Sequence, residues 1–518
     1  MEPGAPRTRW LALAALAIFA LLLPQVLALG YGRDQGIYAV VGHELLDGGV
    51  PYRDAWDFKP PGIFFLFAAS RWLFGPEPWA IRLLECLGLC ATVGAMVHIG
   101  RHAWRDAHLG LVAGVLLLVG HLGLNFWHTA QPESFGGMLT VGALACAARR
   151  GARPRALLAA GVLVGAATLC KPTLAAVGGA LAVELVWRRR SARPAVWLAA
   201  GGLVPIALCV GWFHARGGYE ALAEALFRFA PGYTAVSWQG TDLGWLAWET
   251  VRRAWWFMPP LSLAGLPLLL CRRAYREPLV LALGLAVVLE LAGVALQAKL
   301  FAYHYAGIQP LLALLAALGY RRFFQGARRR PLRIVGALAA AALFGVVFLA
   351  RGTLGAQTRL ALAHYELLLG GLRDHALADE LASAADVDCS QNRAVAEALR
   401  ARVPAGDTVL VWGFEPVLHE LSGRAPASRF IYDVPLRTPW SADALRPELM
   451  AELARRPPGA IVVEHGDLLD WVTGTAEDSA EALLDFPELR SFIVDDYFLA
   501  HRIGDFDVYL ARRLAPDD

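Results

Sequence analysis

The polar stretch at residues 31–61 holds the side chains of this protein that are best suited to chemistry. Asp34 stands near its start, and Lys59, followed by two prolines, closes it. Between them four apolar residues recur at helical spacing and predict a helix that lies flat at a membrane surface: Ile37, Val40, Val41 and Leu45. A fixed carboxylate and a fixed cation at a bilayer surface are what a reaction on a lipid-linked substrate needs.

Lysine usage points to the same chemistry. The chain has 48 basic side chains, and only Lys59, Lys171 and Lys299 are lysines. Lysine binds phosphate as a compact point charge, whereas arginine binds it as a rigid fork. Three ammonium groups at one leaflet would suit a phosphate at the lipid surface. The alternative explanation is a GC-rich codon bias.

Besides the lysines, four residues are candidates for a site. Asp34 is the candidate general base, and a helix N-cap is the alternative role for an aspartate there. Glu133, at another outer helix start, is either a cap or a carboxylate that binds an acceptor or a metal ion. His304 opens a later apolar segment between two tyrosines. Arg82 lies one turn inside an apolar run, where an unpaired charge is costly, so we expect it to reach outward or to pair with Asp34 or Glu133.

The composition is that of a multi-pass membrane protein. The 518 residues are 57% hydrophobic, with a mean hydropathy of +0.44. Arginine clusters lie between the apolar runs, and the positive-inside rule places them in the cytoplasm. No basic stripe falls on a folded domain, so nucleic acid is excluded as a partner. The seven cysteines show no zinc-binding spacing.

With the arginine clusters as cytoplasmic anchors, we predict eleven membrane-spanning helices. An odd number places the N-terminus in the cytoplasm and the C-terminal region outside. Residues 62–74 are apolar but too short to span, so we expect a second interfacial helix there. The predicted spans are 10–29, 79–100, 107–125, 134–148, 155–170, 173–187, 195–214, 254–271, 278–296, 304–320 and 333–351.

The character of the chain changes after residue 351. Residues 352–518 are charged and lack a spanning run, so we divide the chain into a transmembrane domain, 1–351, and an extracytoplasmic α/β domain, 352–518. Strands and helices alternate, which indicates a partly parallel sheet, and the tail predicts an antiparallel hairpin with its turn near Gly504. The expected strands are 407–413, 428–433 and 459–465, and the expected helices are 415–423 and 441–456.

The order of these features resembles the GT-C polyprenyl-phosphate glycosyltransferases. Within that superfamily the chain looks like bacterial members of glycosyltransferase family 39, the group of the protein O-mannosyltransferases and the lipid A aminoarabinose transferases. The resemblance covers about residues 10–351. The matching segments are Arg33-Asp34-Gln35, Asp57-Phe58-Lys59-Pro60-Pro61, Arg82-Leu83, Gln131-Pro132-Glu133, Lys171-Pro172 and Tyr303 to Pro310.

The resemblance implies transfer of a sugar from a polyprenyl-phosphate donor, with inversion, on the outer face of a bacterial inner membrane. Asp34 would be the general base, and Glu133 would bind the acceptor or a divalent metal ion. The donor phosphate would be bound by Lys59, Arg82, Lys171, Lys299 and His304.

The acceptor would be a hydroxyl group of a cell-envelope glycan or lipid. The C-terminal region does not resemble the β-trefoil insert of the protein mannosyltransferases, which argues against a protein acceptor. Protein O-glycosylation stays an alternative, as do a lipid-linked sugar flippase and a scaffold that binds a partner. A flippase would place paired half-helices and charges at mid-membrane.

Overall fold

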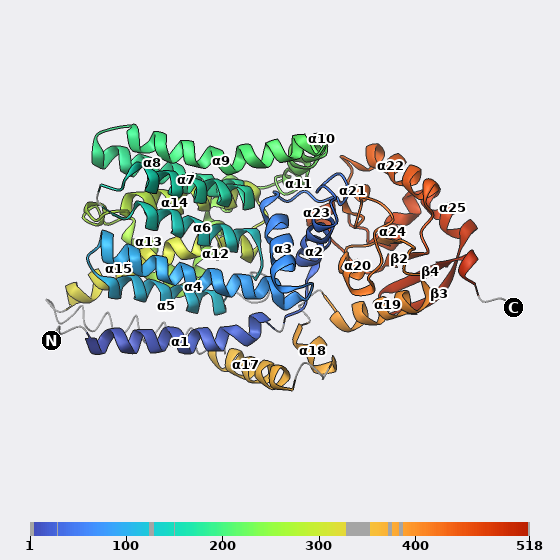
Figure 1. The fold of residues 1–518 in the computed structure, drawn as a ribbon, viewed down its shortest axis with the longest axis horizontal. Coiled ribbons are helices and arrows are strands. Elements are labelled where there is room, and N and C mark those ends of the chain that lie inside the picture. The colour runs from blue at the N-terminus through green and yellow to red at the C-terminus, as the bar shows by residue number, and fades with distance from the viewer. Residues whose placement is uncertain are drawn as a thin grey trace. The chain divides into compact units, whose positions relative to one another are not determined.

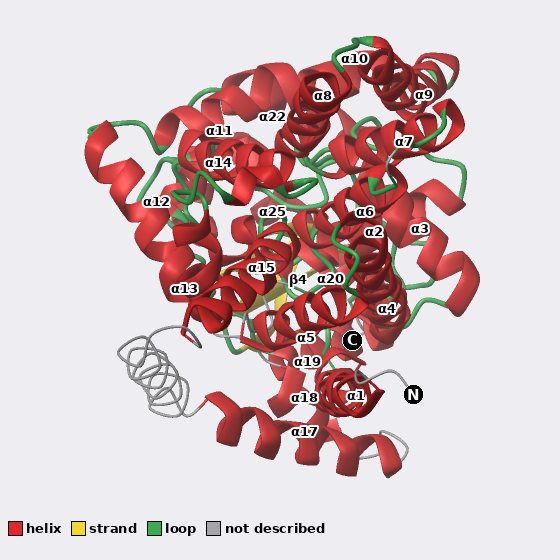
Figure 2. Ribbon diagram, turned by 90° about the vertical axis from the view of Figure 1, so that its left-hand side faces the viewer, coloured by secondary structure: helices red, strands yellow, loops and turns green. Residues whose placement is uncertain are grey.

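The computed structural model describes residues 5–27, 29–123, 129–149, 151–327, 353–370, 375–382 and 387–515. The chain forms two compact units (Figure 1). Unit 1 comprises residues 1–28, 79–209 and 242–373, and unit 2 comprises residues 29–78, 210–241 and 374–518. Helices dominate the described residues, and the strands described there form one small sheet in unit 2 (Figure 2). The predicted domain boundary at 351/352 lies outside the described residues.

Unit 1 is built from apolar helices. Among the described residues, α4, α9 and α14 are long and apolar enough to cross a membrane by length and composition, and several shorter apolar helices accompany them. The helices of unit 1 are α1 (Ala5–Leu27), α4 (Pro78–Ala103), α5 (Ala107–Gly123), α6 (Pro132–Ala147), α7 (Pro154–Cys170), α8 (Ala175–Arg189), most of α9 (Arg193–Ala215), α12 (Leu243–Phe257), α13 (Pro259–Leu268), α14 (Val280–Gln297), α15 (Gln309–Ala327) and α17 (Thr353–Leu369).

Most of these helices begin and end within a few residues of the predicted spans. The span expected at 254–271 is different, because the chain breaks at Met258 between α12 and α13. Pro259 and Pro260 follow the break and have no N–H group, so they can begin a helix but cannot continue one. The span expected at 333–351 lies outside the described residues.

Helices α7 and α9 approach each other closely through glycine. A Cβ atom added at Gly161 would fall on the carbonyl oxygen of Leu198, and one added at Gly165 would fall on that of Gly202. These two glycines of α7 are four residues apart, which is the small-residue spacing that lets membrane helices pack backbone to backbone.

Unit 2 combines the segment after α1 with the C-terminal part of the chain. Helices form at both places where interfacial helices are predicted, as α2 (Arg33–Leu46) and α3 (Gly62–Phe74). Eight consecutive residues of α2, from Gln35 to Gly42, are buried. Gly36 lies against Val417, and Gly42 lies against Phe67 and Ala68, so α2 packs against α20 (Val417–Ser422) as well as α3.

The C-terminal sheet has the strand order β1-β2-β4-β3. Strand β1 (Val409–Trp412) is parallel to β2 (Ala460–Glu464), and the hairpin β3 (Tyr497–Ile503) and β4 (Phe506–Ala511) adds antiparallel strands. The predicted partly parallel sheet and its hairpin at Gly504, where φ is +55°, are therefore confirmed. The remaining helices of unit 2 are α10 (Tyr219–Ala223), a π-helical turn (Glu224–Phe229), α11 (Ala230–Val236), α18 (His375–Ala382), α19 (Cys389–Arg402), α21 (Val434–Arg437), α22 (Ala442–Arg455), α23 (Asp470–Thr473), α24 (Ser479–Ala482) and α25 (Pro487–Asp496).

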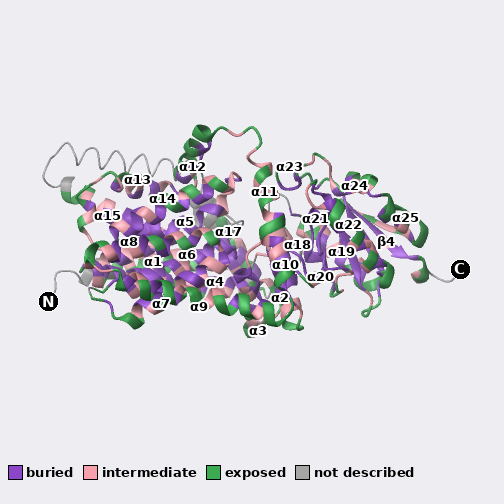
Figure 3. Cartoon of the chain, turned by 90° about the horizontal axis from the view of Figure 1, so that it is seen from above, coloured by how far each residue is buried: buried purple, intermediate pink, exposed green. Residues whose placement is uncertain are grey.

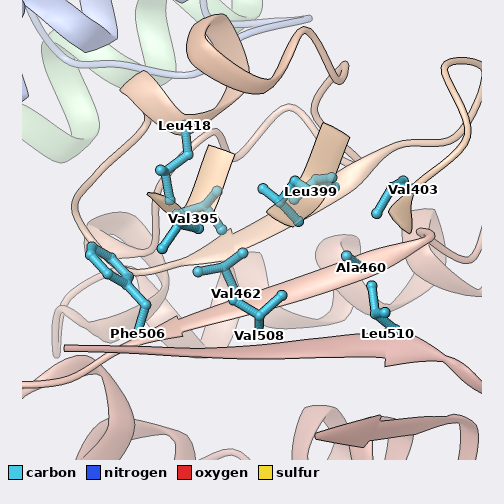
Figure 4. Packing of buried hydrophobic residues seen from close by; sticks show 11 residues of the cluster. Val395, Leu399, Val403, Leu418, Ala460, Val462, Phe506, Val508 and Leu510 are labelled. Atoms are coloured by element: carbon cyan, nitrogen blue, oxygen red, sulfur yellow. The ribbon is translucent and has the colours of Figure 1, made fainter. Parts of the chain in front are cut away.

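One face of the sheet forms an apolar core (Figure 4). Alternate residues of β1, β2 and β4 pack against Val395 and Leu399 of α19 and Leu418 of α20. Strands β1 and β2 are buried throughout. Strand β4 is mostly buried as well (Figure 3).

The strand predicted at 428–433 is wrong. This segment is buried, but it is a loop whose polar groups bond elsewhere: the Trp56 N–H donates to the Arg429 carbonyl, and the Asp433 N–H donates to that of Gly413. Its apolar pattern therefore reflects burial rather than strand pairing.

We predict that Gly161→Ala lowers the free energy of unfolding by about 1–3 kcal/mol, because the added methyl group meets a backbone carbonyl that cannot move aside. The midpoint of thermal unfolding of the purified protein measures this. Gly179→Ala is the control, since a Cβ atom at Gly179 meets nothing within 4 Å. Equal midpoints for the two variants would contradict the proposed close packing.

Candidate functional site

Asp34 lies in the first turn of α2 but is not its N-cap. The N-cap is Gly32, whose N–H donates to the Gln35 side-chain oxygen at 3.1 Å. The N-cap interpretation of Asp34 is therefore wrong, and its carboxylate is left for other contacts. Its place in the first turn still lets the positive end of the helix dipole stabilise the negative charge.

Lys59 is the cation beside Asp34. Its Nζ lies 3.6 Å from Asp34 Oδ2, and both side chains are less than one-fifth exposed. Burial disfavours the charged lysine, but the attraction of Asp34 and of Asp57 outweighs it and raises the pKa of Lys59 well above its usual value. The Tyr52 hydroxyl also donates to the Lys59 carbonyl at 2.7 Å, which fixes the backbone there.

Asp57 is a buried carboxylate whose charge acts on both Lys59 and Asp34. Its side chain is fully buried, and Oδ1 accepts a hydrogen bond from the Tyr432 hydroxyl at 2.7 Å. Burial raises the pKa of Asp57 to about 6, although nearby Lys59 acts in the opposite direction. Asp57 therefore takes up a proton at a higher pH, about 6, than an ordinary aspartate does.

Arg33 joins the start of α2 to the sheet. Its Nε lies 3.0 Å from Glu415 Oε1 and its Nη2 lies 3.2 Å from Glu464 Oε1. Both glutamates are buried, and Glu464 also accepts a hydrogen bond from the Phe414 N–H at 2.6 Å. Burial and the neighbouring Glu415 raise the pKa of Glu464 well above its usual value.

Helix α20 is joined to α2 and α3 by a second ionic contact. Glu420 lies 2.8 Å from His43 Nδ1 of α2 and accepts a hydrogen bond from Arg71 of α3 at 2.6 Å. Sequence analysis missed Glu415, Glu420 and Glu464. Only Glu464 carries a local signal, as a charge at the end of a buried strand.

An aromatic cluster surrounds Phe58, the residue before Lys59. The Phe229 ring lies 5.2 Å and the Tyr233 ring 4.7 Å from that of Phe58, and Trp56 and Trp440 also pack on Phe229. The rings pack in tilted and edge-to-face arrangements, and a cluster of aromatic rings suits contact with a sugar ring or an isoprenoid chain.

A second ionic cluster lies in unit 1, where α6 begins and where α7 and α14 end. Lys171 Nζ donates to Glu133 Oε1 and to Gln297 Oε1, both at 2.6 Å. Thr173, two residues on, donates to buried Glu290 at 3.1 Å. Among the described residues, Oε2 of Glu133 is buried and accepts no hydrogen bond.

Arg82 is fully buried within unit 1. Its Nη1 donates to the Thr129 hydroxyl. Glu85, one turn further along α4, is fully buried and accepts hydrogen bonds from the Ala130 N–H at 3.0 Å and the Ser134 hydroxyl at 3.3 Å. Sequence analysis missed Glu85 and Glu290, although a carboxylate inside an apolar run is the signal that would have found both.

Lys299 and His304 are buried in the segment that follows α14. Ala298 and Leu300, on either side of Lys299, have positive φ angles of 53° and 52°, a conformation that costs an L-residue about 1–2 kcal/mol. Arg253 of α12 donates to the Leu300 carbonyl at 2.8 Å and helps to hold this strained backbone in place. Strain of this kind is concentrated at functional sites.

The structure thus pairs Asp34 with Lys59 in unit 2 and Glu133 with Lys171 in unit 1, and it places Arg82, Lys299 and His304 in unit 1. Across the described residues, no group of three His, Cys, Asp or Glu side chains is arranged to hold a metal ion. The charge of Glu133 is balanced by the ammonium group of Lys171.

Comparison with known proteins identifies the fold. Residues 58–213 match the family model described as dolichyl-phosphate-mannose-protein mannosyltransferase. No curated protein matches the chain. Among solved structures it is similar to ArnT from Cupriavidus metallidurans bound to undecaprenyl phosphate, with a TM-score of 0.60 and 15% identity over 100% of both chains. The apo state of that protein gives a TM-score of 0.62 at 15% identity, over 99% of this chain and 100% of that chain.

A weaker similarity is to the archaeal oligosaccharyltransferase AglB from Archaeoglobus fulgidus, in complex with an inhibitory peptide and a dolichol-phosphate. Its TM-score is 0.47 at 12% identity, over 97% of this chain and 75% of that chain. The two ArnT structures confirm the predicted fold class, a multi-pass helical protein with a C-terminal α/β region.

We predict a pH dependence of stability that Asp57→Asn removes. The folded protein holds the Asp57 proton more tightly than the unfolded chain, where an aspartate has a pKa near ~3.9. Raising the pH from about 3 to about 7 should therefore lower the free energy of unfolding by about 3 kcal/mol. Thermal unfolding of both proteins across this range measures the difference, and Asp47→Asn, at an exposed position, should keep the wild-type profile. Identical profiles for wild type and Asp57→Asn would refute the assignment.

Proposed function

We propose that this chain, which has the GT-C fold of the membrane glycosyltransferases, transfers a sugar from a polyprenyl-phosphate donor to an acceptor hydroxyl. The observation that carries the proposal is the half-buried pair of Asp34 and Lys59, with Lys59 inside the segment that matches the family model. The similar ArnT structure is bound to undecaprenyl phosphate, a lipid of the same class as the proposed product.

Asp34 acts as the general base in this mechanism. Its carboxylate accepts the proton of the acceptor hydroxyl while that oxygen attacks the anomeric carbon from the side opposite the phosphate. The new C–O bond forms as the bond from the sugar to the phosphate oxygen breaks, so the configuration inverts. Lys59 and the N-terminus of α2 hold the Asp34 carboxylate in place before the reaction.

The cationic residues stabilise the departing lipid phosphate. A phosphate leaves as a stable anion, so no second carboxylic acid is needed to protonate it, unlike in glycosidases. Lys171 binds this phosphate and exchanges a contact with Glu133 or Gln297 for one with the phosphate oxygens. We assign the same role, binding of the departing phosphate, to Lys59, Arg82, Lys299 and His304.

Glu133 has its proposed role in binding the acceptor or a metal ion. Its buried Oε2 is the atom that would accept a hydrogen bond from the acceptor or bind a divalent cation. The acceptor is a hydroxyl of a cell-envelope glycan or lipid on the outer face of a bacterial inner membrane. The name of the matched family favours a protein hydroxyl as the second candidate.

We predict that Asp34→Asn lowers kcat by about 10²- to 10⁴-fold, because the amide cannot accept the proton. Release of polyprenyl phosphate from a labelled lipid-linked sugar by the purified protein measures this. Asp47→Asn is the matched control, since Asp47 is exposed at the other end of α2. A folded Asp34→Asn protein with normal turnover would exclude Asp34 as the base.

Lys171→Met should reduce kcat/KM for the donor by about 10²- to 10³-fold and weaken binding of free polyprenyl phosphate, since an ammonium group that contacts the anion is lost. Arg155→Met removes one charge from an exposed position on the same helix and should change neither value. Unchanged lipid-phosphate binding in Lys171→Met would remove Lys171 from the donor site.

A further inference from the structure

A cavity of about 490 Å³ lies in unit 1 where α6 and α8 end and where α7 and α14 begin. These are the helix ends opposite to Glu133 and Lys171. Because α7 has 17 residues, the two ends of that helix are about 25 Å apart. The cavity is therefore separate from the proposed donor site. Its lining residues are Ala147, Ala148, Arg149, Gly151, Glu184, Leu185, Trp187, Arg188, Arg189, Arg190, Pro278 and Leu279.

The lining carries four arginines and one acidic residue, Glu184. Glu184 is buried and fully engaged: it accepts hydrogen bonds from Arg188 Nε at 2.6 Å, from the Ala282 N–H at 2.8 Å and from the Leu279 N–H. Arg188 is committed to this carboxylate and to backbone carbonyls of the segment before α14, including that of Glu277. The cavity thus keeps an excess of positive charge after its internal pairs are formed.

Arg149 and Arg190 supply much of that excess. Both are exposed, and neither forms an ion pair within the described part of the chain. Several like charges around one cavity repel each other unless an anion joins them. The positive-inside rule accounts for arginines at a helix end, but it does not require them to line a cavity.

The backbone of Arg190 is strained. It follows the last residue of α8 with φ 51° and ψ 35°, the left-handed conformation in which helices usually end with glycine. Glycine would relieve this strain, so the Arg190 side chain can be removed without cost to the backbone.

An apolar strip leads away from the arginines along α8. Trp187 is 43% exposed and Val183, one turn earlier, is 51% exposed. The guanidinium of Arg188 lies 5.2 Å from the centre of the Trp187 ring. Tryptophan is enriched at the level of lipid headgroups, where its ring contacts both apolar chains and polar groups.

We propose that this cavity binds the phosphate headgroup of an anionic phospholipid, with an acyl chain along Val183 and Trp187. The positive charges of the arginines attract the negative charge of the phosphate. Basic pockets between membrane helices are known to bind headgroups of this kind. A free phosphate ion shares the headgroup chemistry but not the apolar strip. The proposal is independent of the glycosyltransferase activity.

The test is the affinity of the full-length protein for phosphatidylglycerol, measured by native mass spectrometry in zwitterionic detergent. Phosphatidylcholine and inorganic phosphate are the comparison probes. Each arginine near a headgroup contributes about five-fold, so the double variant Arg149→Gln/Arg190→Gln should lose about 25-fold in affinity for phosphatidylglycerol. The control Arg101→Gln/Arg272→Gln removes two exposed arginines of other clusters and should lose less than two-fold.

The single variant Arg190→Gly separates binding from folding. Glycine fits the left-handed backbone, so the unfolding midpoint should stay the same or rise, while affinity for phosphatidylglycerol falls about five-fold. Undiminished affinity in this variant would overturn the proposal. So would an equal loss in the control double variant, which would mean a diffuse charge effect, or displacement of the lipid by millimolar inorganic phosphate, which would mean a site for the free anion.

Discussion

The contact of Arg33 with Glu415 and Glu464 is the constraint on which unit 2 depends. An arginine in the first turn of a helix opposes the helix dipole, and two buried carboxylates are costly without a cation. The arginine and the two carboxylates therefore stabilise one another. The contact fixes the start of α2, and with it Asp34, to residues more than 380 positions away in the sequence. The C-terminal sheet is in this sense part of the scaffold of the candidate base.

Two other places in unit 2 also have two carboxylates around one cation. Lys59 is attracted by two aspartates, and buried Arg437 contacts both Asp433 and Asp467. Two carboxylates that share one cation repel each other, which raises the pKa of the more deeply buried one. Asp57 is the clearest case, because its side chain is fully buried and its pKa is raised to about 6. Asp34, partly exposed beside the same lysine, is then the carboxylate placed to react.

Most elements of the fold were predictable, because their signals are local. Apolar runs, prolines and arginine clusters predict helix ends without any tertiary contact, which is why residues 62–74 form a helix with those bounds. Two predicted elements are wrong, for different reasons. The segment 428–433 is apolar because it is covered, not because it pairs as a strand, and the continuous span expected across Met258 is broken by the prolines that follow it.

The sequence by itself determined the class of protein, the order of its helices and the residue types suited to lipid-phosphate chemistry. The tertiary structure alone decided which charges meet. Gln35 rather than Asp34 completes the cap of α2, Glu133 contacts Lys171, and Arg33 reaches the sheet. The physical reason is that an ion pair depends on the distance between two side chains in space. Spacing along the chain fixes that distance within one helix, but not between segments that the fold brings together.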